Sequence, residues 1–278
     1  MRALPHRLPR PPRSPLLRQA MLLGAALLAV VLGASAHAGP VLDQVKARHS
    51  VRVCIWPDYY GVTFRNPRTR QLSGIDIDLS AELGRDLQMK VEYVESSFAT
   101  LVQDLKADRC DAGMFAIGMT RERMEHLKFT RPYLASGIYG ITTKSNPVVR
   151  QWSDIDKPGV LVGVQAGTFM GPAMAELLKH AKVVTVTPPA TRERELEGGR
   201  VDVFMTDYPY SRRLLDNADW ARLVAPPQPV HVLPYAYAVK PGDEAWLKAL
   251  DDFVARIQRD GRLDAAASRN GLREIVIR

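Results

Sequence analysis

The chain has 278 residues and a formal net charge of +8, from 38 lysines and arginines against 30 acidic residues. This length excludes a single small core and suits one large domain or two modest ones. Five of the positive charges are arginines within residues 1–38, which hold no acidic residue. Residues 39–278 therefore carry a formal charge of only +3, which gives no reason to expect a nucleic-acid partner.

Residues 1–38 have the pattern of a signal peptide. Their five arginines precede an apolar run from about residue 20 to residue 32, and Ala36 and Ala38 then supply small residues at the −3 and −1 positions. We therefore predict cleavage after Ala38 and export to the periplasm. An uncleaved membrane anchor is the alternative, although the apolar run is short for a membrane span. The residue directly after Ala38 is a glycine and not a cysteine, so we do not expect a lipid anchor.

The first half of the remaining chain alternates strand and helix patterns. Buried-strand patterns cover 51–55, 91–94 and the start of 111–118, and helical patterns cover about 74–87 and a segment with Leu101 and Leu105 on one face. Strands and helices that alternate at this spacing are typical of a parallel sheet covered by helices.

A second series of the same kind follows an extended segment at 136–143. We expect strands at 161–165, 183–186 and 201–205, helices from Thr168 to about 178 and at 193–197, and a second extended segment at 235–239 before two C-terminal helices at about 245–259 and 263–268. The two halves resemble each other weakly, since Asp111 and Asp202 each follow a turn and precede a buried strand. Two sheets joined by two extended segments would face each other across a cleft, where ligands of open α/β sheets bind.

Two cysteines, Cys54 and Cys110, could pair in an oxidising compartment. However, if their strands are parallel neighbours, the two sulfurs would lie several residues out of register. We therefore expect buried thiols in preference to a disulfide. The six histidines are scattered without metal-ligand spacing, so we predict no metal site and no cofactor.

The segment after the third strand carries an unusual charge pattern. Thr120 stands where a helix N-cap belongs, and Arg121 and Arg123 then occupy the first turn, where acidic residues are preferred. An anion bound by Arg123 and by free backbone N–H groups would explain this pattern. A surface arginine pointing into water explains it as well, and this segment alone favours that second interpretation. Met124 and Leu127 would then form the buried face of the helix.

The order of these features resembles the polar-amino-acid group of periplasmic solute-binding proteins, family 3, the receptors of ABC importers. The resemblance covers nearly all of residues 39–278. It implies the two-lobed α/β fold of type II periplasmic binding proteins, with lobe 1 at 39–141 and 236–278 and lobe 2 at 142–235. It also implies a monomer that delivers its ligand to an ABC transporter permease in the inner membrane. The motifs that carry it are Gly74–Leu79 (GIDIDL), Ser97–Leu101 (SFATL), Asp111-Ala112 followed by Thr120-x-x-Arg123, Phe129–Tyr133 (FTRPY), Val162–Thr168 (VGVQAGT) and Gly199–Asp202 (GRVD).

The resemblance also implies roles for four residues. Arg123 matches the arginine that grips the α-carboxylate of the ligand, and Thr168 matches a lobe-2 threonine that adds a hydroxyl to the same group. Asp207 matches the acid that receives the α-ammonium, and Phe98 matches a lobe-1 side chain that packs on the ligand. As structural alternatives, Thr168 and Asp207 can each be the N-cap of a helix, and Phe98 can be a wall residue whatever the ligand.

Three positions bear on the identity of the ligand. Gly118 stands where the family usually has a hydroxyl residue, although its backbone N–H can still donate, and Phe115 replaces a smaller residue. In the first loop, Tyr60 and its aromatic neighbours depart from the usual spacing. A standard amino acid is therefore the first hypothesis for the ligand, but a carboxylate without an amine, or an aromatic acid, fits nearly as well.

Two other functions stay open beside a non-catalytic receptor. The same scaffold in exported cyclohexadienyl and arogenate dehydratases carries a catalytic acid, for which Asp207 is the only candidate here. A sensory or dehydrogenase-associated periplasmic partner, which binds weakly and signals through closure, is the third possibility.

Overall fold

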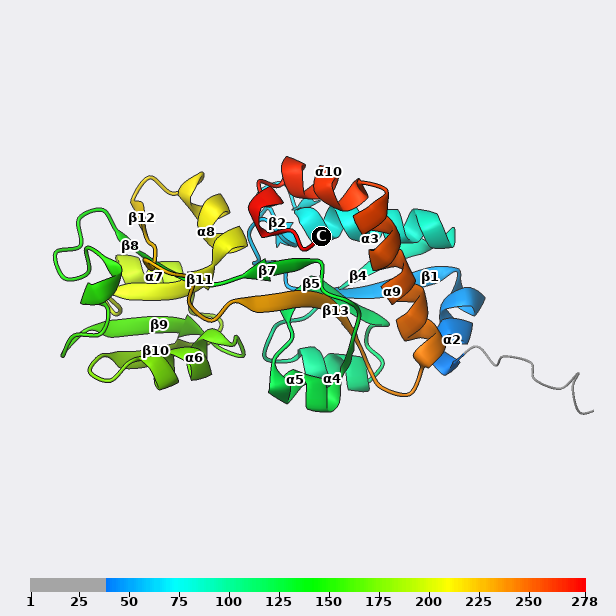
Figure 1. The fold of residues 1–278 in the computed structure, drawn as a ribbon, viewed down its shortest axis with the longest axis horizontal. Helices are drawn as coiled ribbons and strands as arrows, with labels where there is room; N and C mark the ends of the chain where they lie inside the picture. The colour runs from blue at the N-terminus through cyan, green and yellow to red at the C-terminus, as the bar shows by residue number, and fades with distance from the viewer. Residues whose placement is uncertain (1–38) are drawn as a thin grey trace, which may run out of the picture. The chain divides into compact units, whose positions relative to one another are not determined.

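The computed structural model describes residues 39–278, so the predicted signal peptide lies outside the described residues. This part of the chain is an α/β structure built on two main sheets (Figure 1). None of its helices combines the length and the apolar character that crossing a bilayer would require.

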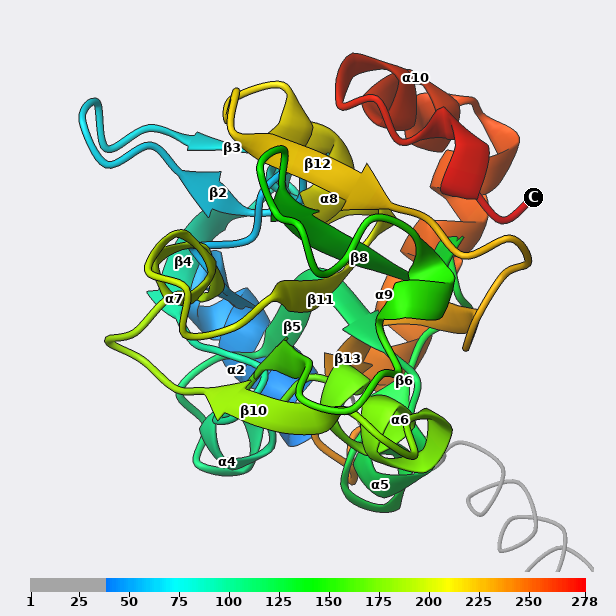
Figure 2. The same ribbon diagram turned by 90° about the vertical axis from the view of Figure 1, so that its left-hand side faces the viewer.

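The first sheet has the strand order β4-β1-β5-β13-β6, and β7 also pairs with β13. Strands β4, β1 and β5 are parallel, as the alternating pattern predicts, whereas β13 runs antiparallel to β5. In Figure 1, α3 and α10 lie on one side of this sheet, and α4 and α5 lie on the other; Figure 2 shows α10 on the side opposite α4 and α5. The elements are α2 (Pro40–Arg48), β1 (Ser50–Ile55), α3 (Ile75–Leu87), β4 (Lys90–Glu95), α4 (Leu101–Lys106), β5 (Ala112–Gly118), α5 (Arg121–His126), β6 (Lys128–Phe129), β7 (Leu134–Ser136), β13 (Leu233–Val239), α9 (Glu244–Arg259), α10 (Arg262–Arg269) and η2 (Arg273–Ile275).

The second sheet has the strand order β10-β9-β11-β8-β12. Its strands β10, β9 and β11 are parallel, and β8 and β12 complete it in antiparallel pairing. The chain passes from the first sheet to the second at Gly137 and returns through residues 225–232. The elements are β8 (Ile138–Thr143), η1 (Trp152–Asp154), β9 (Leu161–Gln165), α6 (Met170–Leu177), β10 (Lys182–Val186), α7 (Arg192–Glu197), β11 (Val203–Asp207), α8 (Tyr208–Leu215) and β12 (Ala221–Val224); a small hairpin of β2 (Phe64–Arg65) and β3 (Leu72–Ser73) lies apart from both sheets.

The two aspartates of the weak internal repeat form equivalent hydrogen bonds in the two sheets. The backbone N–H of Asp111 donates to the Arg52 carbonyl, and its carboxylate accepts from the Arg52 N–H, both at 2.8 Å. Asp202 makes the same pair of bonds with the backbone of Leu161, also at 2.8 Å. Each aspartate therefore extends the parallel ladder by a side-chain bond just before its strand begins.

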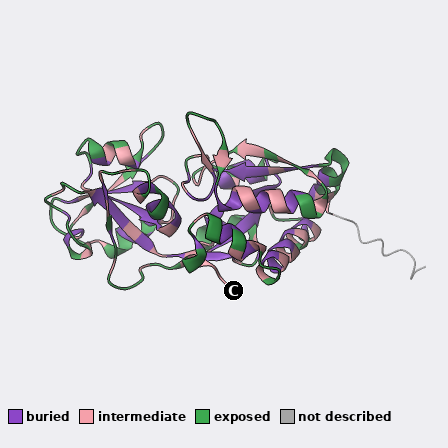
Figure 3. Ribbon diagram, turned by 90° about the horizontal axis from the view of Figure 1, so that it is seen from above, coloured by how far each residue is buried: buried purple, intermediate pink, exposed green. Residues whose placement is uncertain are grey.

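Buried residues concentrate in the strands of both sheets and on the inner faces of the helices (Figure 3). All seven residues of β5 are buried. This continuous burial is typical of a central strand that is covered on both faces, and it explains why the segment reads as an unbroken apolar run.

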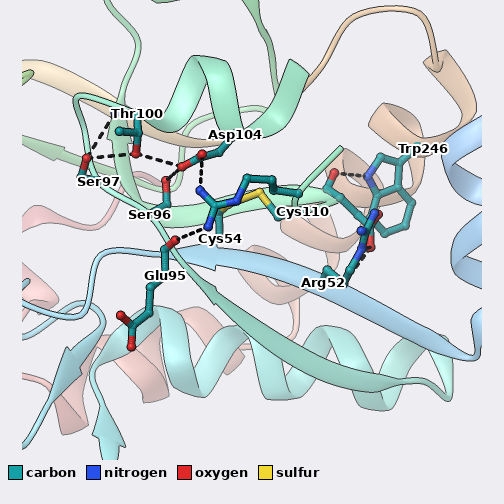
Figure 4. Close-up of a disulfide and its surroundings, with 11 residues drawn as sticks. Arg52, Cys54, Glu95, Ser96, Ser97, Thr100, Asp104, Cys110 and Trp246 are labelled. Atoms are coloured by element: carbon teal, nitrogen blue, oxygen red, sulfur yellow. Dashed lines mark hydrogen bonds and ion pairs between the residues drawn. A yellow bond between two sulfur atoms is a disulfide. The ribbon is translucent and has the colours of Figure 1, made fainter. Parts of the chain in front are cut away.

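The expectation of free thiols is wrong, because Cys54 and Cys110 form a disulfide with a Cα–Cα distance of 5.5 Å. The register argument applies only within the strands, where Cys54 lies opposite Gly113. Cys110 lies before the first residue of β5, in the turn that follows α4, so strand register does not fix its position. Figure 4 shows the disulfide between β1 and this turn, with Asp104 on one side and Trp246 on the other.

Replacing both Cys54 and Cys110 by serine should lower the free energy of unfolding by about 2–4 kcal/mol, because the cross-link restricts the unfolded chain. Its two ends are 56 residues apart in the sequence. Urea titrations of the two proteins would measure the difference, and a reductant should destabilise only the protein that has the disulfide. Two reactive thiols in the unreduced folded protein would contradict the assignment.

Candidate functional site

A small cavity lies where the carboxyl ends of β5, β9 and β11 come together. Its volume is about 20 Å³, which is room for about one water molecule. Five of the seven predicted site residues line it, namely Phe98, Gly118, Arg123, Thr168 and Asp207; the other lining residues are Trp56, Tyr59, Ala116, Phe169, Met170, Arg192, Thr206, Tyr210 and Tyr235.

Arg123 reaches this cavity from the first turn of α5. The Thr120 hydroxyl caps the helix and accepts from the Arg123 backbone N–H at 3.2 Å, as the sequence predicts. The guanidinium then donates through Nη1 to the Gly118 carbonyl at 3.0 Å and through Nη2 to the Gly167 carbonyl at 2.9 Å. Burial lowers the pKa of Arg123 to about 10, so the group stays charged at neutral pH.

The interpretation of Arg123 as a surface residue is wrong, since the side chain is only 6% exposed. Met124 and Leu127 are the two residues expected on the buried face of the helix. Leu127 is buried, but Met124 is 48% exposed, so the expectation is wrong for Met124. Arg123 and Leu127 are four residues apart and point to the same side of the helix. The helix therefore turns its arginine inward in place of the methionine.

Asp207 ends β11 and is the N-cap of α8, so the predicted cap is confirmed. One carboxylate oxygen accepts from the Tyr210 backbone N–H at 3.2 Å. The other accepts from the Tyr235 hydroxyl at 2.8 Å and, in a short hydrogen bond, from the Tyr59 hydroxyl. Burial raises the pKa of Asp207 above its ordinary value, and these three donors oppose the shift.

Arg192, which sequence reasoning missed, is the second guanidinium of the cavity. It is the first residue of α7 and is only 4% exposed. Its Nη1 donates to the Met205 carbonyl at 2.9 Å, and the guanidinium lies 4.4 Å from the centre of the Tyr210 ring and 5.2 Å from that of Phe204. Cation–π contacts of this kind stabilise a buried guanidinium without neutralising it.

The remaining wall of the cavity is aromatic. Trp56, Tyr59 and Phe98 pack against one another with ring centres 5.3 to 5.6 Å apart, and the Arg123 guanidinium lies 5.1 Å from the centre of the Phe98 ring. Phe115 does not line the cavity; its ring packs behind Phe98 at 5.1 Å. Rings around a charged group exclude water and strengthen its electrostatic interactions.

Tyr60 also lies away from the cavity, stacked on Phe64 at 4.3 Å and edge-on to Tyr210 at 5.1 Å. The adjacent residue, Tyr59, lines the cavity in its place. Both tyrosines belong to a loop, where no strand or helix periodicity indicates which side chain turns inward.

Thr168 lines the cavity without capping a helix, so the predicted helix start at Thr168 is wrong. Its hydroxyl donates to the Gln165 carbonyl at 2.7 Å and closes a turn, and α6 begins only at Met170. Gly118, the other small residue of the site, faces Leu233: a Cβ at Gly118 would lie 2.4 Å from the Leu233 Cδ2. Leu233 therefore takes the space that a hydroxyl side chain at position 118 would need.

A larger groove of about 730 Å³ adjoins the cavity and shares Phe98, Arg123, Thr168 and Phe169 with it. Arg123 thus lies at the boundary between the two spaces. No group of three or more His, Cys, Asp or Glu side chains within residues 39–278 is arranged to hold a metal ion. The chemistry available at the site is that of two cations, one hydrogen-bonded acid and aromatic surfaces.

Asp76, the first acid of the GIDIDL motif, supports the cavity from behind. Its carboxylate accepts from the Ala116 backbone N–H at 2.8 Å and from the hydroxyls of Tyr133 and Tyr237. Ala116 lines the cavity with a φ of 48°, a conformation that costs free energy for a residue with a side chain. The hydrogen bond to Asp76 helps to hold the backbone in that shape.

Three comparisons with known proteins bear on the family and the fold of the chain. The family profile described as bacterial extracellular solute-binding proteins, family 3, matches residues 51–271. The cyclohexadienyl dehydratase of Pseudomonas aeruginosa is 29% identical over 86% of this chain and 89% of its own length. The L-cystine-binding protein TcyJ of Escherichia coli is 25% identical over 91% of this chain and 94% of its own.

Among solved structures, the ancestral amino acid-binding protein AncCDT-1, a precursor of cyclohexadienyl dehydratase, superposes with a TM-score of 0.74. It is 28% identical, and the match covers 82% of this chain and 97% of that one. The predicted two-lobed α/β fold is therefore confirmed. The sheets contain antiparallel as well as parallel strands.

Replacing Asp76 by asparagine should change how stability depends on pH. Burial raises the pKa of Asp76 to about 6 from an ordinary value near 3.8. A carboxyl whose pKa is raised in the folded state contributes stability that is fully present below its unfolded pKa and lost as the pH rises through 6. The free energy of unfolding of the unsubstituted protein, minus that of Asp76→Asn, should thus fall by about 2 kcal/mol between pH 4 and pH 8.

Chemical unfolding of both proteins at several pH values measures this difference. Because all other titrating groups are common to the two proteins, their contributions cancel in the comparison. A difference that stays constant from pH 4 to pH 8 would show that Asp76 does not titrate as described.

Proposed function

Because the chain belongs to the bacterial extracellular solute-binding proteins of family 3, we propose that it is the receptor of an ABC importer. In this proposal the mature protein is a periplasmic monomer. Lobe 1, which contains the first sheet, and lobe 2, which contains the second sheet, close on a small carboxylate ligand, an amino acid or a related acid. The closed receptor then delivers the ligand to a permease in the inner membrane.

The observation that carries the proposal is the environment of Arg123. Its guanidinium is buried, and it donates only to carbonyl groups, one at the end of β5 and one after β9. Carbonyl dipoles compensate a buried charge less well than an anion does. A carboxylate that enters between the lobes supplies this anion and gains hydrogen bonds to a charged donor.

Ligand entry requires the cleft to open, since a cavity for one water molecule cannot hold an amino acid. Hydrogen bonds across the cleft join Arg123 to the Gly167 carbonyl, the hydroxyls of Tyr59 and Tyr235 to Asp207, and the Tyr208 N–H to the Ser136 hydroxyl. The adjoining groove reaches Arg123 and provides the route of entry. Once the lobes separate, the Nη2 donor of Arg123 is free for a ligand carboxylate.

The other site residues have supporting roles in this proposal. The hydroxyl of Thr168 and the backbone N–H of Gly118 donate to the same carboxylate, and Asp207 receives the ligand ammonium where the ligand has one. Phe98 packs on the carbon skeleton. Phe115 and Tyr60 do not contact the ligand directly in this proposal. Phe115 supports Phe98, and Tyr60 supports Tyr210.

A specific observation also supports a second candidate, a dehydratase. Asp207 is a fully buried carboxyl whose pKa is raised by burial, and it faces a cavity that could hold a leaving hydroxyl beside it. The cyclohexadienyl dehydratase among the relatives gives this candidate weight. Turnover of prephenate or arogenate by the purified protein would decide for the enzyme, whereas tight binding without turnover would decide for the receptor.

Replacing Arg123 by alanine should abolish ligand binding and leave the fold intact. Truncating one partner of a buried, hydrogen-bonded charge pair costs about 2–5 kcal/mol, or at least about 30-fold in Kd. A thermal-shift screen against amino, keto and aromatic acids identifies ligands, since saturation at 100 times Kd adds about 2.7 kcal/mol of stability. Circular dichroism checks the fold of the variant.

The matched control is Arg121→Ala, since Arg121 lies in the same turn of α5 and is exposed. Its affinity for every ligand should equal that of the unsubstituted protein. Equal losses in the two variants would assign the effect to the net charge of the helix. A screen in which no carboxylate shifts the midpoint would remove the proposed anion site.

Replacing Gly167 by alanine should hinder closure of the cleft. Gly167 has a φ of 75°, and a Cβ there would lie 2.4 Å from the Ala99 nitrogen, which belongs to the other lobe. Backbone atoms cannot yield as a flexible side chain does, so the lobes should stay further apart. We expect a larger radius of gyration by small-angle X-ray scattering with saturating ligand, and weaker binding.

Gly199→Ala is the control for backbone strain. Gly199 also lies in lobe 2 with a similar φ of 67°, but a Cβ there would have no atom within 4 Å. This variant should lose stability by a similar amount and keep normal closure and affinity. A Gly167→Ala protein that closes as tightly as Gly199→Ala would show that the contact with Ala99 does not govern closure.

A further inference from the structure

Two buried arginines, Arg123 and Arg192, line one cavity together with a single acid, Asp207, which interacts electrostatically with Arg192. They are 6% and 4% exposed. Within the described part of the chain neither forms an ion pair, and their side-chain hydrogen bonds go to the carbonyl groups of Gly118, Gly167 and Met205. Arg123 comes from α5 beside the first sheet, and Arg192 comes from α7 beside the second.

The single acid of the cavity does not balance these two charges. Asp207 carries one negative charge, so the three groups together have a net charge of +1. Its two oxygens already accept from the Tyr210 N–H and from the hydroxyls of Tyr59 and Tyr235, which are neutral donors. A zwitterionic ligand has no net charge of its own and would leave the cavity with an uncompensated buried cation, which is costly.

We propose that the ligand carries two carboxylates, one bound by Arg123 from lobe 1 and the other bound by Arg192 from lobe 2. This inference rests on the proposed function and narrows its ligand class to dicarboxylic acids. The amine is a secondary feature, because three donors of the protein already occupy most of the roughly four acceptor positions of the Asp207 carboxylate. Amino diacids, keto diacids and simple diacids all present the two groups that the arginines recognise.

Such a ligand also explains how binding closes the cleft. Both guanidinium groups line the cavity, and the one negative charge of Asp207 offsets only one of their two positive charges. A dicarboxylate that spans the two groups supplies the missing negative charge and forms a charge-assisted hydrogen-bonded contact on each lobe. The aromatic rings of Trp56, Phe98 and Tyr210 exclude water from these contacts and strengthen them. A monocarboxylate can form such a contact with only one of the two arginines.

The test is calorimetric titration of the full mature protein with pairs of compounds that differ by one charge. Each dicarboxylate of four to eight carbons is compared with its own monoamide, and L-glutamate is compared with L-glutamine. In addition, 2-oxoglutarate tests the effect of the amine, and L-arginine tests the effect of the side-chain charge. We expect at least one diacid to bind about 10- to 100-fold more tightly than its monoamide. This ratio of Kd values corresponds to the free energy of a hydrogen bond to a charged group.

Two variants locate the effect. Arg192→Met should remove the preference for the diacid and leave the Kd of the monoamide within about threefold, while Arg192→Lys should retain part of the preference because it keeps the charge. A purely structural role of Arg192 would weaken both compounds equally. That result, or a monoamide or L-arginine that binds unsubstituted protein as tightly as every diacid, would overturn this inference and leave the proposed function standing. Failure of all carboxylates to bind would overturn both.

Discussion

The structure depends on a positive charge buried at the junction of the two lobes. The Arg123 guanidinium donates to one carbonyl on each side of the cleft, 3.0 Å from the Gly118 oxygen and 2.9 Å from the Gly167 oxygen. Among residues 39–278 no carboxylate is a hydrogen-bond partner of this guanidinium, so its desolvation is only partly compensated. Opening of the cleft, entry of an anion and closure around it all change the partners of this one group.

The elements that hold Arg123 are themselves fixed by buried polar groups. Asp76 accepts from the Ala116 N–H and from two tyrosine hydroxyls, and it thereby holds the carboxyl end of β5 beside the cavity. Asp111 and Asp202 fix the beginnings of β5 and β11 by matching bonds to the preceding parallel strands. Each carboxylate is hydrogen-bonded as burial requires, and each places one wall of the cleft. The GIDIDL and GRVD motifs are therefore structural supports of the site.

The sequence predicted those parts of the fold that depend on local periodicity and capping. The parallel strands, the Thr120 cap and the alternative role of Asp207 as a cap follow from patterns of adjacent residues, whereas the five cavity residues follow mainly from the resemblance to the family. One error concerns Met124 on the face of α5, and the others concern the path of the chain outside regular elements. The turn that contains Cys110 has no strand register, and the loop with Tyr59 and Tyr60 has no period that selects the inward ring. Long-range packing decides both.

The two arginines of the cavity illustrate the same limit and also the signal that could have found Arg192. The tetrapeptide Thr-Arg-Glu-Arg occurs twice, at 120–123 and 191–194, and in both copies the threonine hydroxyl caps a helix. The structure buries the second arginine of the first copy and the first arginine of the second copy. In each case the buried arginine lies four residues before a buried leucine, Leu127 or Leu196, on the same face of the helix. Because the position of the leucine selects which arginine turns inward, the two lobes present one cation each to a shared cavity.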